Sequence, residues 1–190
     1  RDEDTVSELF IINSHDYILF FTNRGKVYRV KCYEIPEGSR TSKGTNVANI
    51  LPISSDEKVT SMIKVTKFEE DKYLVMITKN GVIKRTSLTS FDSSRKGGLV
   101  ALDLDEGDEL SWVRLTDGTK NLLVATKKGK CIRFLETDIR AVGRSARGVR
   151  AVRLGENDSV VGMIVVEEDK NILTVSETGF GRLSSPDDYK

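Results

Sequence analysis

The sequence has few of the residues on which small stapled folds and catalytic sites commonly depend: its 190 residues include two cysteines, three prolines, one tryptophan and one histidine. Cys32 and Cys131 are too few and too far apart for a disulfide framework or a paired metal-binding motif. No apolar run approaches the roughly 20 residues that a bilayer-spanning helix requires. A formal net charge of +1 excludes a purely cationic tail, and 38% hydrophobic residues exclude most disordered classes. We therefore expect a globular protein with reduced cysteines, as in the cytoplasm.

Start signals and catalytic patterns are also missing. The chain begins with Arg1–Asp4, without Met and without an apolar signal segment, so we expect it to be part of a longer polypeptide. His15 has no partnered Ser or Cys nearby, no Walker-type Gly-Lys-Ser/Thr loop occurs, and no His/Cys spacing suits a metal. We expect this segment to have no enzymatic activity and no cofactor or metal of its own.

A four-residue phrase ending in glycine recurs four times along the chain. Its glycines are Gly25, Gly81, Gly129 and Gly179, spaced by 56, 48 and 50 residues. Each phrase follows an apolar, β-prone run and precedes a second short run of the same kind. Each phrase is therefore predicted to be the turn of a β-hairpin, where glycine adopts positive φ without steric cost.

Further features follow each hairpin in a constant order. A loop rich in Arg, Lys and Gly comes first, and an alternating apolar segment then predicts a third strand around residues 48–50, 102–104 and 152–154. An acidic turn and a fourth strand complete the repeat. The predicted full repeats are residues 14–66, 71–116 and 119–167, with the last strand of an upstream unit at 1–13 and an incomplete unit at 169–190. No segment has a sustained 3.6-residue apolar period, so the predicted fold class is all-β.

Four strands per unit of about 50 residues are typical of a propeller blade, in which small sheets pack radially around an axis. A β-sandwich is the alternative, but it gives no reason for a basic loop to recur in register. We therefore favour a single propeller-like domain over residues 1–190.

The basic loops supply the candidate binding residues. Lys and Arg beside Gly suit phosphate, since the side chains provide charge and the absent Cβ lets a nucleic-acid backbone approach peptide N–H groups. In a radial fold the loops would recur along one rim, with the acidic turns on another face. The loop candidates are Arg40, Lys43, Arg95, Lys96, Arg144, Arg147 and Arg150, and the hairpin turns add Lys79, Lys127 and Lys128. The alternative is a protein-interaction scaffold in which these loops only improve solubility.

Several phrases resemble the C-terminal domain of the bacterial DNA gyrase A subunit and, less closely, that of the topoisomerase IV subunit. They occur in the family's order at residues 14–28, 33–36, 39–45, 104–110 and 143–150. The family's Gln-Arg-Arg-Gly-Gly-rich box is absent from this sequence, and Arg95–Gly98 is a degenerate counterpart. The resemblance implies a β-pinwheel, a propeller-like ring whose blades exchange strands and whose basic outer rim wraps duplex DNA.

The resemblance also implies a role and partners. Wrapping without sequence preference would serve ATP-driven negative supercoiling by an assembly of two gyrase A and two gyrase B subunits, in the bacterial cytoplasm at the nucleoid. ATP, Mg²⁺ and DNA cleavage would belong to other parts of that enzyme. The implied domain is therefore non-catalytic, with double-stranded DNA as a partner and no membrane.

Overall fold

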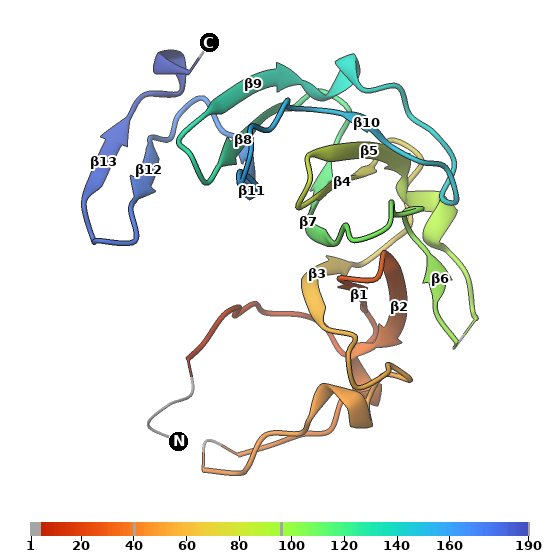
Figure 1. Ribbon diagram of the computed structural model, residues 1–190. Helices are drawn as coiled ribbons and strands as arrows, with labels where there is room; N and C mark the ends of the chain where they lie inside the picture. Colours follow the sequence, from red (N-terminus) through yellow and green to blue (C-terminus); the bar gives the residue numbers. More distant parts are fainter. Residues whose placement is uncertain (1–4, 40, 96, 190) are drawn as a thin grey trace.

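The computed structural model describes residues 5–39, 41–95 and 97–189. Within these ranges the chain forms thirteen β-strands and five short 3-10 helices, and no α-helix. Figure 1 shows small antiparallel sheets that follow one another along an arc in chain order. The predicted all-β, propeller-like fold class is confirmed. None of the helices in the described part is long and apolar enough to cross a membrane.

Four sheets, which we call blades 1 to 4, make up the arc. Blade 1 has the strand order β3-β1-β2-β6, with β1 (Tyr17–Thr22), β2 (Lys26–Lys31), β3 (Val59–Val65) and β6 (Leu99–Val100). Blade 2 has the order β10-β5-β4-β7, with β4 (Tyr73–Thr78), β5 (Val82–Ser87), β7 (Leu110–Thr116) and β10 (Val149–Arg150). Blade 3 has the order β11-β8-β9, with β8 (Asn121–Thr126), β9 (Cys131–Leu135) and β11 (Val160–Val166). Blade 4 is the hairpin of β12 (Ile172–Val175) and β13 (Gly181–Ser184). The 3-10 helices are η1 (Cys32–Glu34), η2 (Val47–Asn49), η3 (Leu88–Phe91), η4 (Glu136–Asp138) and η5 (Pro186–Asp188).

Adjacent blades exchange strands. β6 comes from the second sequence repeat but pairs antiparallel with β2 of blade 1, with Val27 opposite Leu99. β10 comes from the third repeat and pairs in the same way with β5 of blade 2, with Ile83 opposite Val149. This exchange, which the resemblance to a β-pinwheel implies, joins consecutive blades by backbone hydrogen bonds as well as by side-chain packing.

The third strand of each repeat differs from the prediction. The strands β6 and β10 lie just before residues 102–104 and 152–154, and residues 47–49 form η2 where a strand was expected. The alternating segment is wedged between blades: Ala101 and Leu102 are fully buried in the core that contains Leu19 and Val27 of blade 1. An alternating apolar pattern indicates which side chains are buried, but it does not require a strand. In this segment the apolar side chains are buried between blades without backbone pairing to a neighbouring strand.

The strand predicted within residues 1–13 is also wrong for the part that the structure describes. Residues 1–4 lie outside that part, and Thr5–Asn13 form no strand. A strand needs a neighbour for its backbone hydrogen bonds, and no described strand pairs with this segment. Val6, Leu9 and Ile11 are accordingly exposed.

The hydrophobic core lies between blades rather than within one sheet. Leu19 and Phe21 of β1 belong to the same buried cluster as Met76 of β4. The neighbouring Ile77 of β4 points to the opposite face and belongs to a second cluster with Val124 of β8. Both faces of a central strand are thus buried, which accounts for the continuous apolar run before each hairpin turn.

An arginine at one repeated position braces each of the first three blades against the following repeat. Arg29 in β2, Arg85 in β5 and Arg133 in β9 are equivalent in the repeat register. Their contacts are Arg29 Nη1 to Asp92 Oδ1 at 2.7 Å, Arg85 Nε to the Ile139 carbonyl at 2.9 Å, and Arg133 Nη1 to the Pro186 carbonyl at 2.8 Å. These cations therefore serve the junctions between blades.

The hairpin turns are confirmed, with φ of +69° at Gly25 and +81° at Gly129. The two glycines differ in their surroundings. A Cβ on Gly25 would lie 2.5 Å from the Leu102 carbonyl oxygen, in the segment wedged between blades 1 and 2. A Cβ on Gly129 would meet no described atom within 4 Å.

Replacing Arg85 with Met is expected to lower the free energy of unfolding by about 3 kcal/mol, because it leaves a buried carboxylate without its cation. That carboxylate is Glu136, which is 0% exposed and whose Oε2 lies 3.7 Å from Arg85 Nη1. Urea denaturation measures the change. Arg182→Met is the control, since the Arg182–Asp188 pair is exposed and such pairs contribute less than about 1 kcal/mol. Equal losses in the two variants would contradict the brace.

Comparing Gly25→Ala with Gly129→Ala distinguishes two causes of lost stability: backbone strain at positive φ, and steric overlap between blades. Both place a side chain at positive φ, so each is expected to lose about 1 kcal/mol of stability. Gly25→Ala should lose at least about 1 kcal/mol more, because its Cβ overlaps the exchanged segment of the next repeat. Thermal or urea unfolding of both variants gives the difference, and identical losses would show that close packing at Gly25 is unimportant.

Candidate nucleic-acid interface

The ten predicted phosphate-binding residues differ in how well the structure places them. Arg40 and Lys96 lie outside the described residues. Arg144 is half-buried. The remaining seven are exposed: Lys43, Lys79, Arg95, Lys127, Lys128, Arg147 and Arg150. No group of three or more His, Cys, Asp or Glu side chains among the described residues is arranged to hold a metal ion.

The basic loop of the third repeat, residues 143–148, is seated on blade 2. Gly148 packs so closely on β5 that a Cβ there would lie 2.4 Å from the Ile83 carbonyl oxygen. Arg144 Nη1 donates to the Val100 carbonyl over 3.4 Å, which places Arg144 beside β6. Strand exchange thus carries this loop of the third repeat onto blade 2, where it also lies beside β6.

The basic loop of the second repeat, residues 93–98, has the equivalent seat on blade 1. A Cβ on Gly98 would lie 2.6 Å from Cε1 of Tyr28, so the loop rests on this ring. In Figure 1 the loops before β6 and β10 project on the same side of the arc, at the right of the view. The loop that contains Lys43 is not placed in this way, because no strand within residues 41–53 pairs with a preceding blade.

The acidic turns do not occupy a face of their own, contrary to the prediction. Arg147 forms an ion pair with Asp105, and both side chains are about half exposed. Asp103, Asp108 and Arg150 line a shallow groove beside this pair. Strand exchange is the reason, because it brings the basic loop of the third repeat to the acidic segment of the second.

The hairpin lysines lie next to acidic turns. The Lys79 N–H donates to the Glu109 carbonyl over 2.8 Å. Lys128 Nζ donates to the Glu156 carbonyl over 2.5 Å. The hairpin end of the blades therefore places these two lysines next to acidic turns, as the Arg147–Asp105 pair does for the loop before β10.

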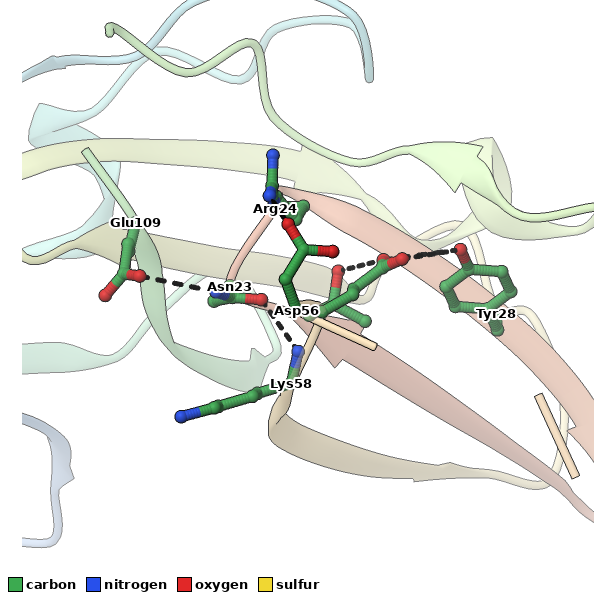
Figure 2. A network of polar contacts seen from close by, with 8 residues as sticks. Asn23, Arg24, Tyr28, Asp56, Lys58 and Glu109 are labelled. Carbon is green, nitrogen blue, oxygen red and sulfur yellow. Dashed lines mark hydrogen bonds and ion pairs between the residues drawn. The ribbon is translucent and has the colours of Figure 1, made fainter. Parts of the chain in front are cut away.

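Figure 2 shows the corresponding end of blade 1. Asn23 Oδ1 accepts from the Lys58 N–H over 2.8 Å, and Asn23 Nδ2 donates to Glu109 Oε1 of blade 2 over 3.3 Å. Arg24 forms an ion pair with Asp56. The turn thus links two blades, and its arginine already has a carboxylate partner.

One basic residue that the sequence did not single out lies beneath the third-repeat loop. Lys84 of β5 is 0% exposed. Its Nζ donates to the carbonyls of Ala101 and Arg144 over 2.5 Å each and to that of Ala146 over 3.2 Å. The available signal was the repeat register, in which uncharged residues occupy the same position in the other two full repeats.

Comparison with known families identifies this architecture. A model described as the DNA gyrase C-terminal domain, a beta-propeller, matches the chain three times, over residues 16–66, 72–117 and 120–167. The chain belongs to the DNA gyrase C-terminal domain family. The second match covers the repeat that supplies β6 and the loop of residues 93–98, and the third covers the repeat that supplies β10 and the loop of residues 143–148.

Curated relatives of the chain are DNA gyrase A subunits. That of Escherichia coli strain K12 is 42% identical over 189 residues, which are 100% of this chain and 22% of the relative. That of Halalkalibacterium halodurans is 53% identical over 152 residues, 80% of this chain and 18% of the relative. That of Haloquadratum walsbyi is 41% identical over 196 residues, 100% of this chain and 23% of the relative. The chain thus spans less than a quarter of the length of these relatives.

Solved structures agree with the family. The C-terminal domain of DNA topoisomerase IV superposes with a TM-score of 0.86 and 29% identity, over 94% of this chain and 56% of that one. A DNA gyrase A C-terminal domain gives a TM-score of 0.78 and 26% identity, over 94% and 57%. The recognition of the gyrase family and its β-pinwheel fold from the sequence is confirmed.

Proposed function

We propose that this gyrase-family domain binds duplex DNA without sequence preference and bends it along the basic loops, in the service of negative supercoiling. The observation that carries the proposal is the placement of the loops: strand exchange seats the basic loops of two consecutive repeats at equivalent sites on two consecutive blades. Membership in the gyrase C-terminal domain family supports the same conclusion.

Phosphate is the ligand chemistry that these loops suit. Arg95 and Arg147 are exposed cations, and Gly97 is exposed with open space where a Cβ would lie. The described part of the chain has no α-helix that could enter a major groove. Contacts would therefore be made to the DNA backbone, and affinity would depend little on base sequence.

The energetic balance sets the strength expected for such binding. Bending duplex DNA costs several kcal/mol, roughly 1–6 for a site of 20–30 base pairs, and phosphate contacts must offset this cost. About six phosphate contacts would give a slope of log affinity against log salt of roughly −5. We expect weak, strongly salt-dependent binding from this domain by itself.

In this proposal the 190 residues act as one non-catalytic domain. DNA cleavage and ATP hydrolysis are assigned to other parts of the gyrase A and gyrase B subunits, which would be its partners. The second candidate function is a protein-interaction scaffold. The observation in its favour is the exposed apolar surface of blade 4, where Leu173, Val175 and Phe180 are 64%, 63% and 81% exposed.

Neutralising the loops tests the DNA-binding proposal. We expect Lys43→Gln, Arg95→Gln, Arg144→Gln and Arg147→Gln together to reduce the salt slope from roughly −5 to roughly −2, since each lost phosphate contact removes about 0.9. Titration of a labelled duplex at several salt concentrations, with two unrelated sequences, measures it.

Two comparison variants sharpen this test. Neutralising Lys79, Lys127 and Lys128 should reduce the slope less, because these residues lie in the hairpin turns and not in the basic loops. Neutralising the exposed Lys67 and Lys170, away from the loops, should leave the slope unchanged. A loop variant with the slope of the unmodified protein, or an affinity insensitive to salt, would favour the scaffold instead.

Asp105→Asn tests whether the carboxylate competes with DNA for Arg147. Because exposed ion pairs contribute about 0.2–1 kcal/mol, we expect duplex affinity to rise about twofold to fivefold at low salt. The increase should disappear when Arg147→Gln is also present, and Glu70→Gln is the control for removal of one exposed negative charge. A rise of equal size in the Glu70 variant would indicate a general charge effect only.

A further inference from the structure

Lys84 is a buried cation whose contacts are to backbone carbonyls. It reaches two segments that are distant in sequence: the carbonyl of Ala101, just after β6, and those of Arg144 and Ala146, in the basic loop. The Gly143 carbonyl lies 3.4 Å from the same Nζ. One ammonium group therefore ties the loop of the third repeat to the segment that follows the exchanged strand of the second.

We propose that Lys84 is a positioning residue that holds the loop of residues 143–148 in the conformation that binds DNA phosphates. This inference rests on the proposed function, because it assigns a task to the loop that the function requires. Lys84 itself is 0% exposed and is covered by the loop. Any effect of this side chain on DNA must therefore act through the loop.

The chemistry of the Lys84 contacts suits a role in positioning the loop better than a role in stabilising the whole fold. An ammonium group has three donors and no acceptor, so it suits a convergent set of carbonyl oxygens. Burial of the charge is costly, and burial together with the nearby Arg144 lowers the pKa of Lys84 from 10.5 to about 8, although Asp103 acts in the opposite direction. A buried polar group that costs stability can still select one arrangement of the chain, because other arrangements leave its partners without hydrogen bonds.

The repeats show how specific this contact is. The position of Lys84 is occupied by Tyr28 in blade 1, and the loop of residues 93–98 packs on that ring through Gly98. Blade 3 has Ile132 there, within an apolar cluster. Each of the three positions thus carries a different side chain, and a buried cation holds the loop on blade 2.

The test compares Lys84→Met with Tyr28→Phe in the 190-residue chain. Met approximates the length of the lysine stem and removes the three donors, whereas Phe keeps the ring under the other loop. Backbone hydrogen exchange without DNA reports the loop directly, through Ala146, whose N–H donates to the Gly143 carbonyl over 3.1 Å, and through Val149 of β10. We expect about tenfold faster exchange at these amides in Lys84→Met, and no change there in Tyr28→Phe.

Titration with duplex DNA then tests whether the position of this loop affects DNA binding. Lys84→Met should weaken DNA binding about tenfold and reduce the salt slope by about 2, as expected for losing Arg144 and Arg147 as phosphate contacts. Gly148→Ala should have the same effect with Lys84 intact, because its Cβ would overlap the Ile83 carbonyl and displace the loop. If Lys84→Met does not fold, Lys84→Gln, which retains two donors, takes its place in every comparison.

A pH profile provides a signature of the buried amine. The folded chain binds fewer protons than the unfolded chain between pH of about 8 and 10.5, so the stability of the unmodified protein relative to Lys84→Met should rise across that range. Unchanged loop exchange in Lys84→Met would overturn the positioning role, whatever happens to DNA affinity. Faster loop exchange with unchanged DNA affinity would support the loop contact but overturn the assignment of this loop to DNA.

Discussion

Strand exchange between blades is the constraint on which the rest of this structure depends. A two-residue strand from one repeat completes the sheet of the preceding repeat, so no blade along the middle of the arc is independent of its neighbour. The short strands contribute few hydrogen bonds themselves. Their effect is to fix where the next segment enters the junction, and the buried Ala101 and Leu102 then fill the space between sheets.

The same constraint determines the electrostatics of the surface. A basic loop precedes each exchanged strand, so the loop is carried to the neighbouring blade with the strand. There it meets the acidic segment of another repeat, as the Arg147–Asp105 pair shows. Charges that are well separated in the sequence therefore become mixed, and a polyanion bound at the loops would compete with nearby carboxylates for their cations.

Basic residues in this domain perform two kinds of work. Arg85 and Lys84 are adjacent in one strand, and their side chains are almost entirely buried at different junctions. Arg95 and Arg147 are exposed in loops. Counting Lys and Arg cannot distinguish these uses, since a guanidinium or ammonium group suits a buried carbonyl or carboxylate as well as a phosphate.

The all-β class, the hairpins, the fourth strands and the repeat order follow from the sequence alone, because apolar runs, turn glycines and their spacing are local features of the chain. The tertiary structure decided which blade receives each exchanged strand and where Arg147 and Lys84 find their contacts. It also decided that residues 5–13 pair with none of the described strands. Most of these are relations between residues far apart in the chain, as between Lys84 and Ala146 or Arg147 and Asp105. Hydrogen bonds and ion pairs of this kind depend on how neighbouring sheets pack, and that packing is not encoded in any single repeat.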